Sequence, residues 1–133
     1  MRISCRSDIV VKESDFKKLM SLLQSADTDI ATTLEQELTH ANIVEDKRYP
    51  KNAVCMGSLV TYVELISNQR KTIRLVYPDQ ANLDEMKVSV LSPVGCALIG
   101  MKRNCSIDWK MLNNQHVKFK VESVEQICLS ECQ

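Results

Sequence analysis

Glycine, aromatic residues and long apolar runs are all scarce in this chain, and each shortage excludes a class of protein. Only three of the 133 residues are glycine, and they form no glycine-rich loop of the kind that binds phosphate groups. No apolar run approaches the roughly 20 residues that a membrane-spanning helix needs, and the N-terminus lacks the apolar stretch of a signal peptide. We therefore expect a cytoplasmic protein with no membrane partner.

A surplus of charge of either sign is also missing. The 17 lysine and arginine residues balance 17 aspartate and glutamate residues, which argues against direct, sequence-specific nucleic acid binding. The length predicts one domain, or a small domain with an appendage. The six cysteines include no Cys-x-x-Cys pair, so in a reducing compartment they are most simply buried apolar thiols.

Residues 88–100 predict a strand that leads into a short capped helix. Val88 and Val90 fall on one face of the strand. Pro93 ends the pairing because it has no N–H to donate. Ser92 is a good helix N-cap with proline at the first helical position, and Gly100 suits the residue that follows a helix. This pattern predicts an exposed corner at Ser92 and Pro93, where we expect a functional surface.

The first 50 residues predict a short antiparallel helical hairpin. Apolar residues recur at helical spacing in two segments: Phe16, Leu19, Met20 and Leu23, then Ile30, Leu34, Leu38 and Ala41. We expect Ser14 to cap the first helix, Thr28 or Asp29 to cap the second, and residues 24–29 to form the turn. Arms of about twelve residues would be only about 18 Å long.

Residues 51–133 predict a second unit built on an antiparallel sheet, after a hinge at 47–52. The strand-like segments are, in order, 59–66, 72–77, 87–91, 106–112 and 117–124. Asn113 and Asn114 predict a tight turn between the last two strands, and Gly57 suits a bulge. With the short helix that begins at Pro93, these segments predict an α+β fold.

Asp27 and Asp29 lie at the predicted hairpin tip, where two carboxylates could hold a Mg²⁺ ion supplied by a partner. Mg²⁺ usually needs further carboxylate or phosphate ligands, so turn and cap roles are favoured. Cys128 and Cys132, near the C-terminus, lack the second close ligand pair of a structural zinc site. We expect no bound metal and no cofactor.

No combination of residues in the sequence predicts catalysis. A tight turn at the paired asparagines would place Met111, not Cys105, opposite His116, which argues against a Cys–His nucleophile pair. Lys102 and Arg103 follow the predicted helix, either as solvated side chains or as contacts for phosphate or an acidic partner. The residues favour a binding module over an enzyme.

The segment 88–100, Val-Ser-Val-Leu-Ser-Pro-Val-Gly-Cys-Ala-Leu-Ile-Gly, resembles the strand-Ser-Pro-helix signature of the Gre family of bacterial transcript-cleavage factors. Residues 60–62 (Val-Thr-Tyr) and 75–78 (Leu-Val-Tyr-Pro) extend the resemblance, which covers residues 53–127. Residues 55–58 (Cys-Met-Gly-Ser) and the short N-terminal helices resemble a regulator within that family more than its cleavage factors.

The resemblance implies an FKBP-like C-terminal domain with a helical coiled-coil hairpin in front of it, and binding to RNA polymerase at the mouth of its secondary channel. On this basis we expect the docking surface to be the corner formed by Ser92, Pro93 and Val94. Lys102 and Arg103 would be charges at its rim.

The resemblance also implies a role for the hairpin tip. In the family, acidic tip residues bring Mg²⁺ to the polymerase active site. The arms here are far shorter, so we do not expect Asp27 and Asp29 to support cleavage. The chain also departs from the family at Asn104 and Cys105, where Gly-Asp is usual, which puts the partner contacts of that loop in question.

We therefore expect a non-enzymatic transcription regulator that binds RNA polymerase and competes there with Gre-type factors. Two alternatives stay open: a short-armed transcript-cleavage factor, and a cytosolic adaptor that acts on another protein without polymerase contact. The FKBP likeness also raises peptidyl-prolyl isomerisation. That activity is disfavoured because its pocket is lined by aromatic residues, which make up 5% of this chain.

Overall fold

The computed structural model describes residues 9–110 and 116–126. In chain order the elements are β1 (Val10–Lys12), α1 (Glu13–Leu23), α2 (Asp29–Thr39), β2 (Asn42–Val44), η2 (Asp46–Arg48), β3 (Leu59–Glu64), β4 (Gln69–Val76), η3 (Pro78–Gln80), η4 (Leu83–Glu85), β5 (Lys87–Ser89), α3 (Pro93–Leu98), β6 (Ser106–Lys110) and β7 (His116–Glu125). This mixture of helices and strands confirms the predicted α+β class.

Helices α1 and α2 form the predicted hairpin. Each has 11 residues, which corresponds to about 16 Å at a rise of 1.5 Å per residue. The apolar positions of the sequence pattern face inward: Leu19 and Leu23 of α1 and Leu34 and Leu38 of α2 are buried. Periodicity alone therefore identified the faces that pack.

The two helices begin in different ways. Of the two predicted caps of α2, Thr28 is the one that forms, because its hydroxyl oxygen accepts the N–H of Ala31 at 3.0 Å. The prediction that Ser14 caps α1 was wrong. The helix begins directly after Lys12, the last residue of β1, and Lys12 makes no side-chain cap. Ser14 is instead hydrogen-bonded to Asp46.

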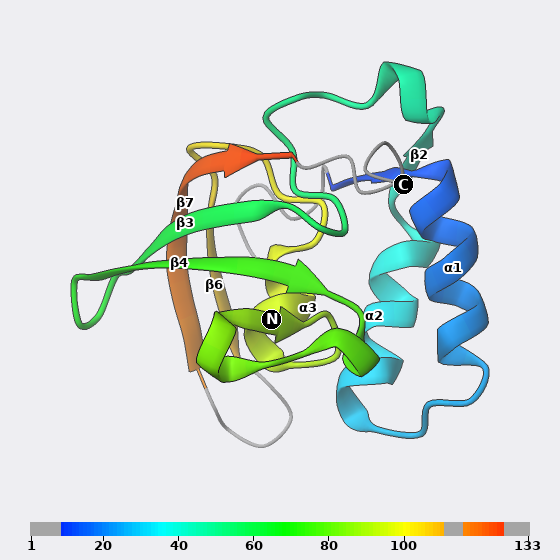
Figure 1. Cartoon of the computed structure of the whole chain (residues 1–133), viewed down its shortest axis with the longest axis horizontal. Helices are drawn as coiled ribbons and strands as arrows, with labels where there is room; N and C mark the ends of the chain where they lie inside the picture. The colour runs from blue at the N-terminus through cyan, green and yellow to red at the C-terminus, as the bar shows by residue number, and fades with distance from the viewer. Residues whose placement is uncertain (1–8, 111–115, 127–133) are drawn as a thin grey trace.

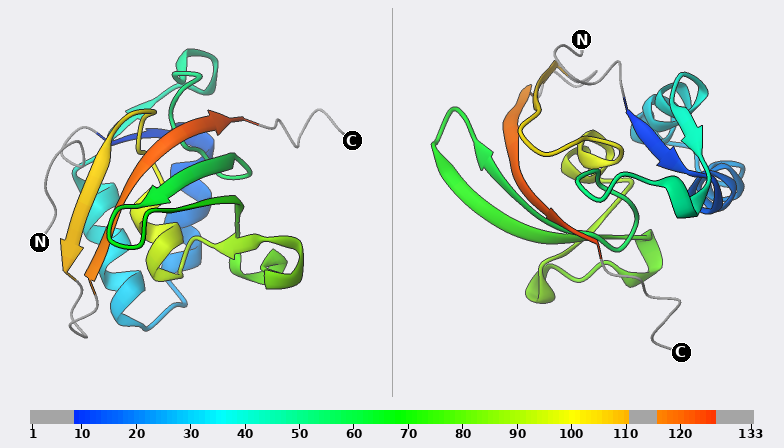
Figure 2. Two further views of the ribbon diagram at one scale, coloured as in Figure 1. Left: turned by 90° about the vertical axis from the view of Figure 1, so that its left-hand side faces the viewer. Right: turned by 90° about the horizontal axis from the view of Figure 1, so that it is seen from above.

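Both helices lie alongside the rest of the chain rather than projecting from it (Figure 1). In the view from above, α3 lies between the helical hairpin and the curved sheet (Figure 2). One core cluster joins all three layers and includes Leu19, Leu34, Leu38, Val60, Leu75, Leu98 and Phe119. The hairpin thus buries its apolar face against α3 and the sheet, since two short helices gain little stability alone. The division into units at residue 50 stays a prediction.

The five-stranded sheet has the order β5-β4-β3-β7-β6. Its neighbours are antiparallel except β4 and β5, which are parallel. The expectation of a wholly antiparallel sheet was therefore wrong at this edge. The segment 77–86 returns the chain to the level of Arg74, so that β5 runs in the same direction as β4. Figure 1 shows that segment as a separate loop beside β5.

Of the local predictions about the strands, one is confirmed and one is wrong. Gly57 forms the predicted bulge: it has φ +86°, its N–H donates to the carbonyl of Leu75 at 2.7 Å, and the carbonyl of Ser58 accepts the N–H of Leu75 at 3.0 Å, so two residues face one. Lys110, not Met111, lies opposite His116. The predicted turn at 113–114 lies outside the described residues.

A two-stranded parallel sheet of β1 and β2 ties the two ends of the hairpin together. The N–H of Asn42 donates to the carbonyl of Ile9 at 3.0 Å, and the N–H of Val10 donates to Gly100 at 3.2 Å. Gly100 has φ +83°, and a Cβ there would lie 2.8 Å from the Cβ of Ile9. Gly100 thus follows the end of α3, as predicted. Because it has no side chain, β1 can also pack against it.

The cysteines follow the sequence expectation only in part. Cys55 and Cys96 are buried free thiols, whereas Cys105 is disulfide-bonded. Cys5, Cys128 and Cys132 lie outside the described residues. Among residues 9–110 and 116–126, no helix has the length and apolar character needed to cross a bilayer.

Candidate docking surface

Ser92 fixes the start of α3, as the sequence predicted. Its hydroxyl donates to the carbonyl of Ser89 at 2.7 Å and accepts the N–H of Gly95 at 3.0 Å. Pro93 occupies the first helical position, where its missing N–H costs nothing. The hydroxyl of Ser92 is therefore engaged within the chain, and its role at this corner is to hold α3 against the end of β5.

Gly95 lets α3 approach β5 closely. It is buried in the first turn of the helix, and a Cβ at this position would lie 2.0 Å from the carbonyl oxygen of Ser89. No side chain fits in that space. Ser92, Pro93 and Val94, just before Gly95, are half-buried rather than fully exposed. The prediction that Ser92 and Pro93 form an exposed corner is therefore correct in position but overstates their exposure.

Lys102 and Arg103 are attached to a different part of the fold. Lys102 forms an isolated backbone bridge with Ala53. The N–H of Arg103 donates to Asn52 at 2.8 Å, and its Nε donates to the carbonyl of Glu122 at 3.0 Å. These bonds place the two cations beside the chain that enters β3 and the end of β7. Their membership of the same docking surface as Ser92 stays a prediction.

Asp27 and Asp29 are exposed at the turn between α1 and α2, which agrees with their predicted position at the hairpin tip. Asp29 is the first residue of α2 and not its cap. Among residues 9–110 and 116–126, no three His, Cys, Asp or Glu side chains gather in a way that could hold a metal ion. The described part of the tip carries these two carboxylates.

Sequence reasoning missed a buried polar junction between α1 and the segment before β3. Asp15 is only 8% exposed, and its carboxylate accepts the N–H of Met56 at 3.0 Å. Burial raises the pKa of Asp15, and it also raises the pKa of the Cys55 thiol and of the Tyr77 phenol. The Tyr77 hydroxyl is buried without a hydrogen-bond partner among the described residues. No periodicity in the sequence marks this junction, because Asp15 lies within an ordinary charged helix start.

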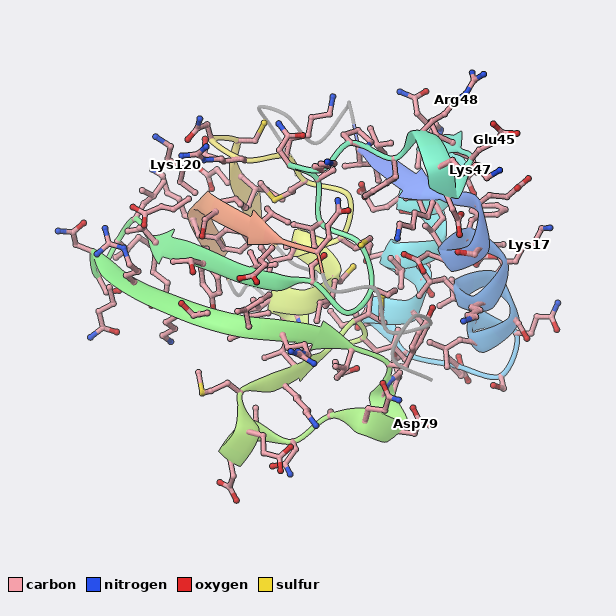
Figure 3. The ribbon with its side chains drawn as sticks, turned by 45° about the horizontal axis from the view of Figure 1, so that its top comes forward. Lys17, Glu45, Lys47, Arg48, Asp79 and Lys120 are labelled. Atoms are coloured by element: carbon pink, nitrogen blue, oxygen red, sulfur yellow. The ribbon has the colours of Figure 1, made fainter. Side chains whose placement is uncertain are left out.

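A shallow depression lies between the start of α1 and η2. Its volume is about 390 Å³, and it is lined by Glu13, Ser14, Lys17, Glu45, Asp46 and Lys47. Lys17, Glu45 and Lys47 lie at this end of the molecule, well separated from Asp79 and Lys120 (Figure 3). Charges of both signs line it, and Asp46 is already bonded to Ser14, so it shows no preference for an ion of either sign.

The sequence also gave no signal for an exposed apolar feature between β4 and β5. Leu83 is 79% exposed and Met86 is 48% exposed. Both lie next to β5, on the segment that leads to the α3 corner. The sequence analysis assigned no structure between the strands predicted at 72–77 and 87–91, and only the folded chain places these apolar side chains in solvent.

The comparison with protein families decides what kind of domain this geometry belongs to. Residues 49–126 match the family model described as "Transcription elongation factor, GreA/GreB, C-term", which is more than half of the chain. The chain belongs to the GreA/GreB family. The resemblance stated from residues 88–100 is thereby confirmed.

Relatives of this GreA/GreB-family chain include both regulators and elongation factors. The chain is 30% identical over 109 residues to the regulator of nucleoside diphosphate kinase of Escherichia coli K12, covering 80% of each chain. It is 34% identical over 67 residues to the elongation factor GreA of Thermodesulfovibrio yellowstonii, covering 50% of this chain and 42% of that one. The expected likeness to a regulator within the family is confirmed.

A solved structure supports the fold of this GreA/GreB-family chain over nearly its whole length. The GreA/GreB elongation factor from Nitrosomonas europaea superposes with a TM-score of 0.74 at 28% identity, covering 90% of this chain and 98% of that one. The superposition covers a larger share of the chain than the family match at residues 49–126 does. The arrangement described above, with the helices packed along the core, is thus similar to a solved member of the family.

Proposed function

We propose that the chain is a non-enzymatic transcription regulator that binds RNA polymerase near its secondary channel and competes there with Gre cleavage factors. Family membership supports the partner, since GreA/GreB proteins are transcription elongation factors by name. The corner at Ser92, Pro93 and Val94 is the proposed contact, with Lys102 and Arg103 as weaker contacts at the rim.

The observation that carries this proposal is the length and packing of the hairpin. Each arm has 11 residues, and the buried faces of both helices belong to the same core cluster as the sheet. A projecting tip would require these contacts to break. Asp27 and Asp29 therefore stay close to the body of the molecule, so the chain occupies the site without delivering Mg²⁺ to the polymerase active centre.

We also propose that residues 51–133 form an FKBP-like domain and that residues 1–50 are an N-terminal appendage to it. The five-stranded sheet with α3 packed on one face supports this assignment. The start of the matched family region at residue 49 supports the boundary.

Binding to core polymerase tests the proposal directly. We expect the wild-type chain to bind and to displace a labelled GreA-type factor, and we expect Pro93→Asp to weaken binding by at least about tenfold. Aspartate is tolerated in the first turn of a helix, so the variant should keep its fold. Pro50→Asp is a matched control at another half-buried proline. Equal affinity of the wild type and Pro93→Asp would remove this corner from the proposed interface.

An RNA-shortening assay on backtracked polymerase separates this function from cleavage. We expect no shortening with the wild-type chain at any concentration that saturates binding. Shortening that disappears in an Asp27→Asn, Asp29→Asn double variant would instead support a short-armed cleavage factor.

A second candidate is an adaptor that acts on another protein without polymerase contact. The similarity to a regulator of nucleoside diphosphate kinase favours it. Affinity capture from lysate, followed by identification of the bound proteins, distinguishes the two functions. Our proposal predicts that polymerase subunits are captured. The adaptor function predicts that nucleoside diphosphate kinase is captured without polymerase.

A further inference from the structure

The segment 78–86, here termed the 78–86 lobe, projects from the body of the molecule beside β5 (Figure 2). It carries Leu83 and Met86, which are 79% and 48% exposed. Single exposed apolar residues are common and need no explanation. Two within four residues, on a projecting segment, are typical of a surface that a partner covers.

The lobe is held in one conformation by its own hydrogen bonds. Asn82 and Lys87 exchange two backbone hydrogen bonds of 2.9 Å each, and the side chain of Asn82 accepts the N–H of Asp84 at 3.0 Å. The carbonyl of Met86 accepts the N–H of Arg74 at 2.8 Å. The apolar side chains are therefore presented by a preorganised segment, which lowers the entropic cost of binding.

Met86 adds a second and independent indication. Its φ is +59°, in the left-handed region, where glycine or asparagine would be less strained. The chain thus places a large apolar side chain at a position that is unfavourable both for its backbone and for its exposure. Strain of this kind is often found where a residue has a binding role.

The charges of the lobe define its partner. Asp79, Asp84 and Glu85 are its only charged residues, and Glu85 is paired with Lys87 at 2.8 Å. Asp79 is exposed on η3, at the opposite end of the lobe from η4 (Figure 3). A partner that receives Leu83 and Met86 would therefore offer an apolar pocket with basic residues around it.

The lobe continues into the proposed polymerase contact. Lys87–Ser89 follows it directly as β5, and the carbonyl of Ser89 accepts the hydroxyl of Ser92. Resting on the proposed function, we infer that Leu83 and Met86 are the apolar anchor of the polymerase interface, inserted into a pocket with a basic rim. The α3 corner and the lobe then form one surface on either side of β5.

The test compares two exposed apolar sites in a polymerase-binding assay. We expect the double variant Leu83→Gln, Met86→Gln to bind core polymerase about tenfold more weakly than the wild type. Ile66→Gln is the matched control, because Ile66 is 74% exposed but lies in the turn between β3 and β4. Its affinity should stay within about twofold of the wild type. Unchanged melting temperatures would show that both variants keep their fold.

A second pair of substitutions tests the charge argument. Asp79→Asn with Asp84→Asn should weaken binding at low salt and reduce its salt dependence, since rim charges act mainly on the rate of association. Wild-type affinity in the Leu83, Met86 double variant, or an equal loss in Ile66→Gln, would overturn the inference while leaving the proposed function intact. Failure of the wild-type chain to bind polymerase would overturn both.

Discussion

Asp46 caps helix α1 from 32 residues away in the sequence. Its carboxylate accepts the N–H of Ser14 at 3.2 Å and the hydroxyl of Ser14 at 2.6 Å. The cap therefore comes from η2, after the hairpin has closed, and not from the residue before the helix. One end of α1 is thus fixed by the same segment that leads into the sheet.

We predict that Asp46→Ala lowers the free energy of unfolding by about 1 kcal/mol, the usual cost of removing a helix cap. Urea denaturation at pH 7 is the measurement. Glu45→Ala is the control, since Glu45 is exposed and pairs with Arg48 only at the surface, where ion pairs contribute little. An equal effect of the two substitutions would contradict a capping role for Asp46.

Asp46 and Asp15 should influence acid stability in opposite directions. Hydrogen bonds from Ser14 lower the pKa of Asp46 below its ordinary value of 3.8, so its stabilising effect is complete above that value and is lost as the pH falls below it. Burial raises the pKa of Asp15 above 3.8. The folded state then binds the proton more tightly, so the contribution of Asp15 falls as the pH rises from 3.8 through its raised pKa.

Two substitutions at Asp15 separate its charge from its hydrogen bond. Asp15→Asn keeps an acceptor for the N–H of Met56 and removes the buried charge, so we expect stability at pH 7 at least equal to that of the wild type. This substitution should also abolish the decline in stability that Asp15 causes as the pH rises from 3.8 through its raised pKa. Asp15→Ala leaves the N–H of Met56 without its partner and should cost about 1–3 kcal/mol. Denaturation curves from pH 3 to pH 8 would check both; a steeper decline in Asp15→Asn would contradict the assigned pKa direction.

Gly95→Ala should be among the most damaging single-methyl additions to this chain. The new Cβ would lie 2.0 Å from the carbonyl oxygen of Ser89, which is backbone and moves only if α3 or β5 shifts. We expect a loss of more than about 2 kcal/mol, at the upper end for overpacked sites. Val94→Ala, one residue earlier and half-buried, should cost less. Thermal unfolding of both variants measures the difference, and a stable Gly95→Ala protein would mean that α3 packs less closely than described.

Ser92→Ala should change stability more than it changes binding. The hydroxyl of Ser92 makes both of its hydrogen bonds within the chain, so its removal should cost about 1 kcal/mol of folding free energy. Polymerase affinity measured well below the melting temperature should change by less than about threefold. A large loss of affinity with unchanged stability would show that the hydroxyl contacts the partner directly.

Much of the local structure could be predicted from residues close together in the chain. The spacing of Leu19, Leu23, Leu34 and Leu38 indicated two helices and their buried faces. Ser92, Pro93 and Gly100 marked both ends of α3, because caps, first-turn prolines and left-handed glycines act within a few residues of one another. The same segment carried the family resemblance that the comparison confirmed.

The candidate site was predicted less completely than the elements that carry it. Ser92 and Pro93 lie where the pattern placed them, but they are half-buried, because burial depends on how closely α3 packs against β5 and not on the local motif. The exposure of Leu83 and Met86 was not predictable at all. An apolar residue in a loop is covered or uncovered by elements distant in the sequence.

The sequence by itself determined the α+β class, the short hairpin, the capped α3 and the family, because each depends on periodicity or on a contiguous motif. Tertiary structure decided the parallel β4–β5 edge, the packing of the hairpin on the core, the cap that Asp46 provides to α1 and the bond between Asp15 and Met56. The last two join residues 32 and 41 positions apart. Such contacts require the two ends of a long loop to meet, and local patterns do not show whether their energy offsets the entropy of that loop closure.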